Sequence, residues 1–528
     1  MNKLLLTLAS IGLVTGACAQ QNKTAMKYAE IVSPELANKH LSIIASDAFE
    51  GRETGKPGAD KAAHYIADEF KSLGLQPIVN GSYFFDVPVV QNSFKVNSFT
   101  VNGTTLEMGK DFTARGGAGT KNIDAKDVVF IGYGIGADNY DDLKGVDIAG
   151  KVVMYISTGE PMSDGKSKIT GTEKVSDWST PRSRKRIDLI QSKKPLLILA
   201  VSTIAPSGGP RPGGQGGGRA LPMMLKHEGE NPAVVITIPM ATADMILKNS
   251  GKTVADLKGA IDQSGAPASQ IIKADIATSY ATEEIPVKAV DVLGLLPGSD
   301  PKLKDEVLVI SAHYDHIGLM PEGSKDMVNN GADDDGSGTT AVMELARAFS
   351  KAKKDGHGPR RSILFLGNVG EEKGLLGSEY YTDHPVIPLA NTIADLNVDM
   401  IGRIGVDYIG KPDSANNVYV IGSSMLSTDL HKVGENANNL YTHLNLDYKY
   451  DDPADPNRFY YRSDHYNFAK HGVPIIFYFN GVHADYHRPG DEVSKINFPL
   501  LAKRAQLVFY TAWDLANADK RPVVDGKK

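Results

Sequence analysis

The C-terminal half of the chain contains four short apolar segments, each followed closely by histidine or acidic residues. These segments span residues 307–310, 363–366, 393–398 and 475–479. Apolar runs of this length between turn residues are typical of buried strands, and the helical patterns between them indicate a mostly parallel sheet with helices on both faces. The carboxyl ends of parallel strands meet at one edge of a sheet, so we expect the polar residues that follow them to converge.

The residues after these strands are of the types that bind divalent metals. They are His313 and Asp315, the pair Glu371-Glu372, Asp399, and Tyr486-His487. A glycine-rich loop at 331–338 adds Asp333, Asp334 and Asp335, and three adjacent carboxylates repel one another unless solvent or a cation intervenes. Each motif alone is common in turns and helix starts, but their combination predicts a metal centre.

The cysteine count limits the ligand chemistry. Cys18 is the only cysteine, so thiol catalysis and cysteine-bound zinc are excluded. Imidazoles and carboxylates without sulfur suit zinc, and manganese or cobalt accept the same ligands.

The length of 528 residues predicts more than one folded unit. We interpret residues 27–118 as the N-terminal part of the domain that carries the metal motifs, and residues 283–520 as its main part. Residues 119–282 form short β-rich runs and are predicted to be a separate inserted domain. Amphipathic patterns predict helices at 57–73 and 498–516. The segment 207–219 is almost wholly Gly, Pro, Ser, Gln and Arg, which predicts a mobile loop.

The first 19 residues have the pattern of a secretory signal peptide. A basic start and a short apolar run precede small residues, and cleavage after Ala19 fits the Ala-x-Ala rule. An exported protein, periplasmic or secreted, is therefore expected. The alternative is a lipoprotein anchored to a membrane through Cys18. No later apolar stretch is long enough to span a membrane, and the net charge of −6 with no basic block gives no indication of a nucleic-acid partner.

The metal motifs resemble those of the co-catalytic zinc aminopeptidases, a family that also contains glutamate carboxypeptidase II and the glutaminyl cyclases. The resemblance rests on His313-Tyr314-Asp315, the loop 331–338, Glu371-Glu372, residues 397–402 and Tyr486-His487. It covers roughly 40–95 and 285–515. It implies the zinc exopeptidase fold, which is α/β with a mixed, mostly parallel sheet sandwiched by helices. The insert resembles a protease-associated domain through residues 132–135 and 145–153.

The resemblance also implies a role for each site residue and two zinc ions per chain. His313 and Asp399 would hold one zinc, Glu372 and His487 the other, and Asp334 would bridge them. Glu371 would be the general base, Asp315 would orient His313, and Tyr486 would help to bind the oxyanion. Asp464 and His465 match a family block but receive no role. His316 and His483 are interpreted as structural or surface histidines rather than extra ligands.

These expectations favour a metallo-aminopeptidase that hydrolyses peptide bonds at free N-termini. Three alternatives stay open. A carboxypeptidase of the same family needs arginines for the substrate carboxylate, and Arg403, Arg458 and Arg462 lie in suitable loops. A glutaminyl cyclase keeps many of the same motif residues. A non-catalytic, receptor-like protein is disfavoured because every expected ligand is present.

Overall fold

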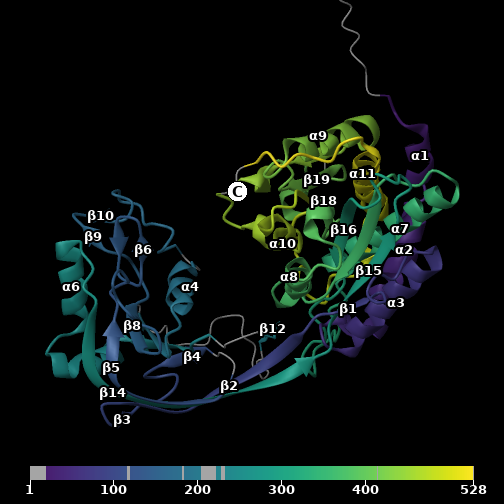
Figure 1. Cartoon of the computed structure of the whole chain (residues 1–528). Helices are drawn as coiled ribbons and strands as arrows, with labels where there is room; N and C mark the ends of the chain where they lie inside the picture. The colour runs from purple at the N-terminus through teal and green to yellow at the C-terminus, as the bar shows by residue number, and fades with distance from the viewer. Residues whose placement is uncertain are drawn as a thin grey trace, which may run out of the picture. The chain divides into compact units, whose positions relative to one another are not determined.

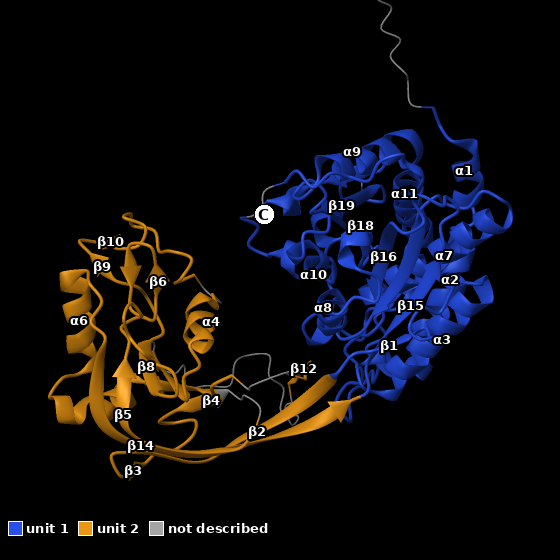
Figure 2. Cartoon of the chain, viewed as in Figure 1, with its two compact units in different colours: residues 1–88, 288–528 blue, residues 89–287 orange. Residues whose placement is uncertain are grey.

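The computed structural model describes residues 20–115, 119–180, 183–203, 222–226, 232–412, 414–452 and 454–526. The expected signal peptide with Cys18, and the expected loop at 207–219, lie outside these residues. The chain forms two compact units (Figure 2). Unit 1 comprises residues 1–88 and 288–528, and unit 2 comprises residues 89–287.

Unit 1 is built on an eight-stranded sheet with the strand order β1-β15-β17-β16-β18-β21-β19-β20. The neighbours β17, β16, β18 and β21 are parallel, as are β19 and β20, while the other three pairs are antiparallel. The strands are β1 (Phe84–Asp86), β15 (Val290–Leu296), β16 (Val307–His313), β17 (Ser362–Asn368), β18 (Thr392–Val398), β19 (Asn417–Ile421), β20 (Asn445–Asp447) and β21 (Ile475–Phe479). The four predicted strands thus form the parallel centre of the sheet.

Helices cover both faces of this sheet (Figure 1). Successive side chains of a strand point to opposite faces, and every residue of β16, β17 and β18 is buried, so both faces are covered. On β17, Phe365 lies between Phe70 of α3 and Phe349 of α7, whereas Leu364 and Leu366 pack with Tyr381 of α8 and Phe468 of α10. The helices are α1 (Lys23–Ala29), α2 (Pro34–Ile44), α3 (Pro57–Leu73), α7 (Gly338–Lys354), α8 (Leu376–Asp383), α9 (Thr428–Ala437), α10 (His465–Lys470) and α11 (Phe498–Asn517). The predicted α/β fold class is confirmed.

Local sequence signals explain where two of these helices begin and end. In α3, Pro57 supplies the first helical residue, and Gly74 ends the helix with a φ of 79° that glycine adopts without strain. In α11, the Asn497 side chain accepts a hydrogen bond from the backbone N–H of Leu500 and caps the helix. Both helices lie where the amphipathic patterns predict them.

Unit 2 contains a nine-stranded sheet in which β2 pairs along its length with residues 276–287 of β14 as a long ribbon (Figure 1). Its other central strands, β5, β8, β11 and β13, are parallel neighbours. The strands of unit 2 are β2 (Val89–Val101), β3 (Thr104–Thr105), β4 (Thr113–Arg115), β5 (Lys121–Phe130), β6 (Gly136–Ala137), β7 (Tyr140–Asp141), β8 (Val152–Ile156), β9 (Met162–Ser163), β10 (Lys166–Ser167), β11 (Leu197–Ser202), β12 (Met223–Leu225), β13 (Val235–Pro239) and β14 (Gln270–Val287). The helices α4 (Lys185–Ser192), α5 (Met240–Leu247) and α6 (Val254–Ser264) complete it.

The boundaries of the inserted unit differ from those expected. It begins at Val89 rather than at residue 119, and ends at Val287 rather than at residue 282. The reason is the pairing of β2 with β14, which runs from Val89 opposite Val287 to Val101 opposite Ile276. Phe99 and Val101 of β2 are buried in the core of unit 2. Residues 89–115 therefore belong to the insert.

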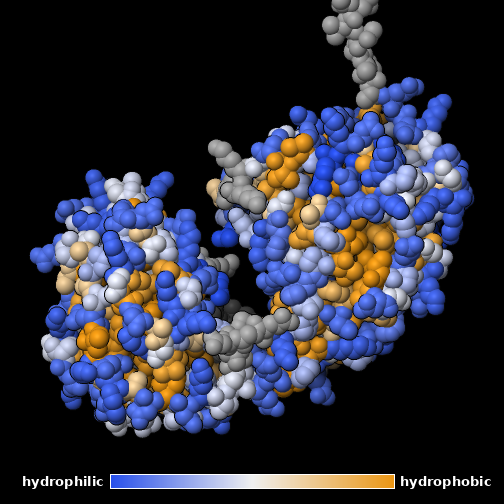
Figure 3. Space-filling model, viewed as in Figure 1, coloured by the Kyte–Doolittle hydropathy of each residue, from blue (hydrophilic) through white to orange (hydrophobic). Residues whose placement is uncertain are grey.

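The face of the protein drawn in Figure 3 carries both polar and apolar areas. Hydrophilic residues cover most of the visible face of each unit, with hydrophobic residues gathered in a few areas (Figure 3). Among the described helices, none is long and apolar enough to cross a membrane.

Glu344 of α7 makes the stability of unit 1 depend on pH. Its side chain is buried, and burial raises its pKa from 4.5 to about 8, against the lowering effects of the Ser33 backbone and Arg347. Between these values the folded chain holds a proton that the unfolded chain releases, so stability falls as pH rises from about 4.5 to about 8. We expect Glu344→Gln to unfold at a higher temperature than the native chain at pH 8, by the equivalent of up to roughly 4 kcal/mol, and to differ by less than about 1 kcal/mol at pH 5. Thermal unfolding followed by circular dichroism tests this, and equal midpoints at pH 8 would contradict it.

Candidate metal centre

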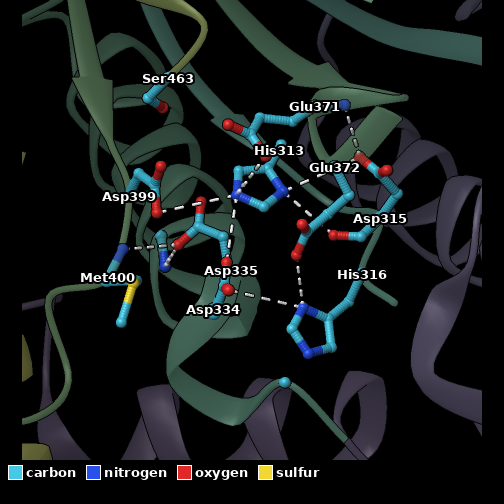
Figure 4. A network of polar contacts seen from close by, with 12 residues as sticks. His313, Asp315, His316, Asp334, Asp335, Glu371, Glu372, Asp399, Met400 and Ser463 are labelled. Atoms are coloured by element: carbon cyan, nitrogen blue, oxygen red, sulfur yellow. Dashed lines mark hydrogen bonds and ion pairs between the residues drawn. The ribbon is translucent and has the colours of Figure 1, made fainter. Parts of the chain in front are cut away.

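The strand ends of unit 1 bring the predicted residues together, as Figure 4 shows. His313 is the last residue of β16, and Asp399 directly follows β18. Glu371 and Glu372 follow β17 after Gly370, whose φ of 75° turns the chain. His487 comes from the loop after β21. The expected convergence at one sheet edge is therefore observed.

Two groups of potential ligands share Asp334. In the first group, the His313 Nε2 atom lies 3.4 Å from Asp334 Oδ1 and 3.7 Å from Asp399 Oδ1. In the second, the His487 Nε2 atom lies 3.1 Å from both Asp334 Oδ2 and Glu372 Oε2. The two oxygens of the Asp334 carboxylate thus face different histidines. In the first group, His313, Asp334 and Asp399 have ligand atoms close enough together to hold one ion. In the second group, the same is true of Asp334 and Glu372 together with a further histidine, His316.

His316 lies within the second group, although sequence reasoning left it outside the ligands. Its side chain is fully buried, and its Nδ1 atom lies 2.9 Å from Glu372 Oε1 and 3.7 Å from Asp334 Oδ2. In the sequence, only its position directly after the His313-Tyr314-Asp315 motif points to His316 as a ligand. Position in the sequence does not distinguish a metal ligand from a structural histidine. His483 behaves as expected: it is buried away from both groups, with its Nε2 atom 3.2 Å from Asp333 Oδ2.

Within the acidic triplet, only the middle residue faces the histidine groups. Asp333 Oδ1 accepts hydrogen bonds from the Ser337 hydroxyl and the Gly402 N–H. Asp335 Oδ1 accepts from the N–H groups of Gly338 and Met400. The outer two carboxylates therefore hold the loop to its neighbours and leave Asp334 to the centre.

Two buried residues that sequence reasoning missed hold this loop in place. Arg52 donates to the backbone carbonyls of Tyr314, Ile44, Asn330 and Gly331 over 2.6–2.9 Å. Asp491 Oδ2 accepts from the N–H groups of Asp333 and Asp334, at 2.9 and 3.1 Å. A lone Arg or Asp in a sequence gives no signal of such a role, because the partners are backbone atoms far along the chain.

Asp315 contacts His313 through its backbone. The His313 Nδ1 atom lies 3.0 Å from the Asp315 carbonyl oxygen, whereas the nearest carboxylate oxygen is 3.8 Å away. The carboxylate instead accepts hydrogen bonds from the Thr54 hydroxyl, at 2.7 Å, and from the Glu371 N–H, at 3.2 Å. The contact between His313 Nδ1 and the Asp315 carbonyl directs His313 Nε2 toward Asp334 and Asp399. The Asp315 carboxylate holds the Glu371 backbone close to the same histidine.

The charges at this site fit a cation. Burial opposes ionisation of Asp334, yet His316, His313 and His487 hold its pKa well below the ordinary value. Burial also opposes a charged His487, but Asp334 and Glu372 raise its pKa to about 10. Burial raises the pKa of Glu371 well above its usual range. Among the described residues, Asp334 Oδ2, Glu372 Oε1 and both ring nitrogens of His316 have no hydrogen-bond partner, although all are buried. Buried polar atoms are normally satisfied, and a divalent ion would satisfy the two carboxylate oxygens and the Nδ1 atom of His316.

A cavity opens beside the first group. The Tyr486 hydroxyl lies 3.3 Å from a guanidinium nitrogen of Arg462 at its rim. Arg403 is paired with Asp485, and the guanidinium of Arg458 lies over the Tyr461 ring. Asp464 and His465 are buried and are not part of the cavity lining. The lining is acidic at one end and apolar at the other: His313, Asp334, Glu371, Asp399, Met400, Phe459, Arg462, Phe477, Phe479, Val482 and Tyr486.

Comparisons with known proteins agree with this geometry. Residues 291–512 match the profile of the family described as Peptidase family M28. The chain is 26% identical over 243 residues to "Aminopeptidase YwaD" of Bacillus subtilis (44% of this chain, 46% of that protein). It is 29% identical over 233 residues to a "Probable leucine aminopeptidase" of Trichophyton verrucosum (43% of this chain, 58% of that protein). The chain thus spans about half the length of the curated relatives it matches.

A solved structure shares the fold. The chain is similar to the aminopeptidase from Aneurinibacillus sp. strain AM-1, with a TM-score of 0.50 and 17% sequence identity over 96% of this chain and 98% of that one.

Proposed function

We propose that this chain, whose residues 291–512 match the profile of peptidase family M28, is a zinc aminopeptidase. The observation that carries the proposal is the shared carboxylate of Asp334, which lies between His313 on one side and His487 on the other. A single carboxylate facing two ligand groups is the arrangement that a two-metal hydrolase requires.

The ligand set proposed is His313 and Asp399 for one ion, Glu372 and His487 for the other, and Asp334 for both. Two zinc ions, when bound, lower the pKa of a water and polarise the scissile carbonyl. At the first position, His313, Asp334 and Asp399 have ligand atoms close enough together to hold an ion. At the second, the His487 Nε2 atom lies 3.1 Å from both Asp334 Oδ2 and Glu372 Oε2. Manganese or cobalt would fit the same donors.

The remaining groups move the proton and hold the oxyanion. Glu371 lines the cavity, with its Oε2 atom 3.9 Å from His313 Nε2, and in the proposed role it accepts a proton from the attacking water and passes it to the leaving amine. Tyr486, which also lines the cavity, would donate a hydrogen bond from its hydroxyl to the oxyanion. Asp315 positions both His313 and Glu371, through its carbonyl and its carboxylate respectively.

The cavity favours an aminopeptidase for substrates with an apolar N-terminal residue. Its inner wall is formed by Met400, Phe459, Phe477, Phe479 and Val482, which leaves little to recognise a substrate carboxylate. Arg403 is engaged by Asp485 and Asp491. Of Arg403, Arg458 and Arg462, only Arg462 lines the cavity. Its guanidinium could bind a substrate carboxylate, which supports the carboxypeptidase alternative. The centre itself does not separate either enzyme from a glutaminyl cyclase.

We also propose that the protein is exported and that unit 2 is a protease-associated domain. Export is supported by the sequence pattern of a signal peptide in the first 19 residues. These residues lie outside the part of the chain that the structure describes. The intact mass of the mature protein distinguishes cleavage after Ala19 from a lipid-modified Cys18.

Metal analysis tests the centre. Protein purified without chelator should contain about two zinc ions per chain, because the five ligands form two positions with one bridge. Chelation should abolish hydrolysis, and added zinc should restore it. A reproducible content of one ion would favour the cyclase alternative, and full activity with no metal would refute the proposal.

A further inference from the structure

We propose that His316 is a fourth protein ligand at the second metal position, whereas the first position has three protein ligands. The inference rests on the proposed metal centre, but not on the choice of substrate. The two positions then differ in affinity: the second holds its ion more tightly, and the first keeps more room for water and substrate.

The distances around the second position fit a tetrahedral ion. Zinc bonds of about 2.0–2.2 Å place tetrahedral ligand atoms about 3.3 Å apart. His487 Nε2 lies 3.1 Å from Asp334 Oδ2 and from Glu372 Oε2. His316 Nδ1 lies 2.9 Å from Glu372 Oε1 and 3.7 Å from Asp334 Oδ2. The two imidazole rings face the same carboxylates with their centroids 5.8 Å apart, at an angle of 72°.

A simple hydrogen bond does not account for His316. Although its Nδ1 atom is only 2.9 Å from Glu372 Oε1, the geometry does not meet that of a hydrogen bond, and neither ring nitrogen has such a partner among the described residues. A fully buried imidazole without a hydrogen-bond partner lowers the stability of the folded chain. Coordination to a metal ion would give the Nδ1 lone pair a partner.

The surrounding chain fixes this ring in place. The His316 N–H donates to the Arg52 carbonyl over 3.1 Å. Gly331 lies against the ring: a Cβ atom there would come within 2.5 Å of His316 Cδ2, so a larger residue would displace the imidazole. The Arg52 side chain also donates to the Gly331 carbonyl. Arg52 therefore holds both the His316 backbone and the Gly331 backbone that packs against the imidazole ring. Figure 4 shows the ring directed at Asp334 and Glu372.

The first position has one ligand fewer. His313, Asp334 and Asp399 are its proposed protein ligands, and the cavity adjoins them. Four protein ligands hold a zinc ion more firmly than three, and the first position keeps an open coordination place beside the cavity. The first equivalent of zinc added to metal-free protein should therefore enter the position that contains His316.

X-ray absorption on the native chain loaded with one equivalent of zinc tests this directly. The multiple-scattering signal counts imidazoles, and the prediction is two per zinc, from His316 and His487. One imidazole per zinc would overturn the proposal, because it would place the ion at the first position or leave His316 unbound. This measurement needs no variant that could fail to fold.

A variant provides the second arm. His316→Gln should bind its first zinc at least about 100-fold more weakly than the native chain, since even residues that only support a ligand contribute 10–100-fold. His40→Gln is the matched control, because His40 is also a buried histidine of unit 1, hydrogen-bonded at 2.8 Å to Tyr65 instead. Unchanged first-zinc affinity in a folded His316→Gln protein would refute the inference. A native chain that binds no metal at all would instead refute the proposed function.

Discussion

The Glu371→Gln variant is expected to keep its metal and to lose at least about 10²-fold in kcat, the low end for a general base. The amide preserves the shape of the side chain but cannot accept the proton of the attacking water. The Glu371 carboxylate lies on the cavity side of His313, 3.9 Å from its Nε2 atom. Zinc content and kcat are measured on the same preparation, so that loss of catalysis is separated from loss of metal.

The neighbouring residue supplies the comparison. Glu372→Gln should lose metal at one position, and added zinc should partly restore its activity, because Glu372 lies 3.1 Å from the His487 ring nitrogen. Glu344→Gln, a buried glutamate in α7, controls for the substitution itself and should keep full activity and full metal. If Glu371→Gln loses zinc while Glu372→Gln keeps it, the two roles are exchanged. If both remain fully active, the mechanism proposed for this pair is wrong.

Asp334→Asn is expected to have the largest effect on the centre, because it removes the carboxylate that both positions share. A neutral amide is a much weaker ligand, so the zinc content should fall below one per chain. Since the ions supply several kcal/mol of the catalytic effect, kcat/KM should fall by at least about 10³-fold. Asp514→Asn is the matched control: Asp514 is a partly buried aspartate of α11 outside the centre, and it should keep both ions. Retention of two zinc ions by Asp334→Asn would contradict the shared role.

Much of unit 1 could be predicted because its signals are local. The apolar run at 475–479 coincides with β21, and the helix expected at 57–73 coincides with α3. Strand ends at one edge of a parallel sheet also explain how His313, Asp399 and Glu372 meet although they are distant in sequence.

The parts that could not be predicted depend on long-range contacts. The insert begins at Val89 because β2 pairs with β14, nearly two hundred residues later, and no composition change marks that point. The roles of Arg52 and Asp491 rest on hydrogen bonds to backbone atoms, which place no constraint on the partner's residue type. The position of His316 depends on Gly331 leaving room for its ring, a steric relation that spacing does not reveal.

Hydrolysis of aminoacyl-anilides beside their N-blocked counterparts tests the central claim most directly. The account predicts chelator-sensitive release from substrates with a free amino end, strongest for apolar N-terminal residues, since Met400 and Phe477 line the cavity, and no release from blocked ones. Release of C-terminal residues from N-blocked peptides, with no hydrolysis of free aminoacyl-anilides, would contradict it and identify a carboxypeptidase instead.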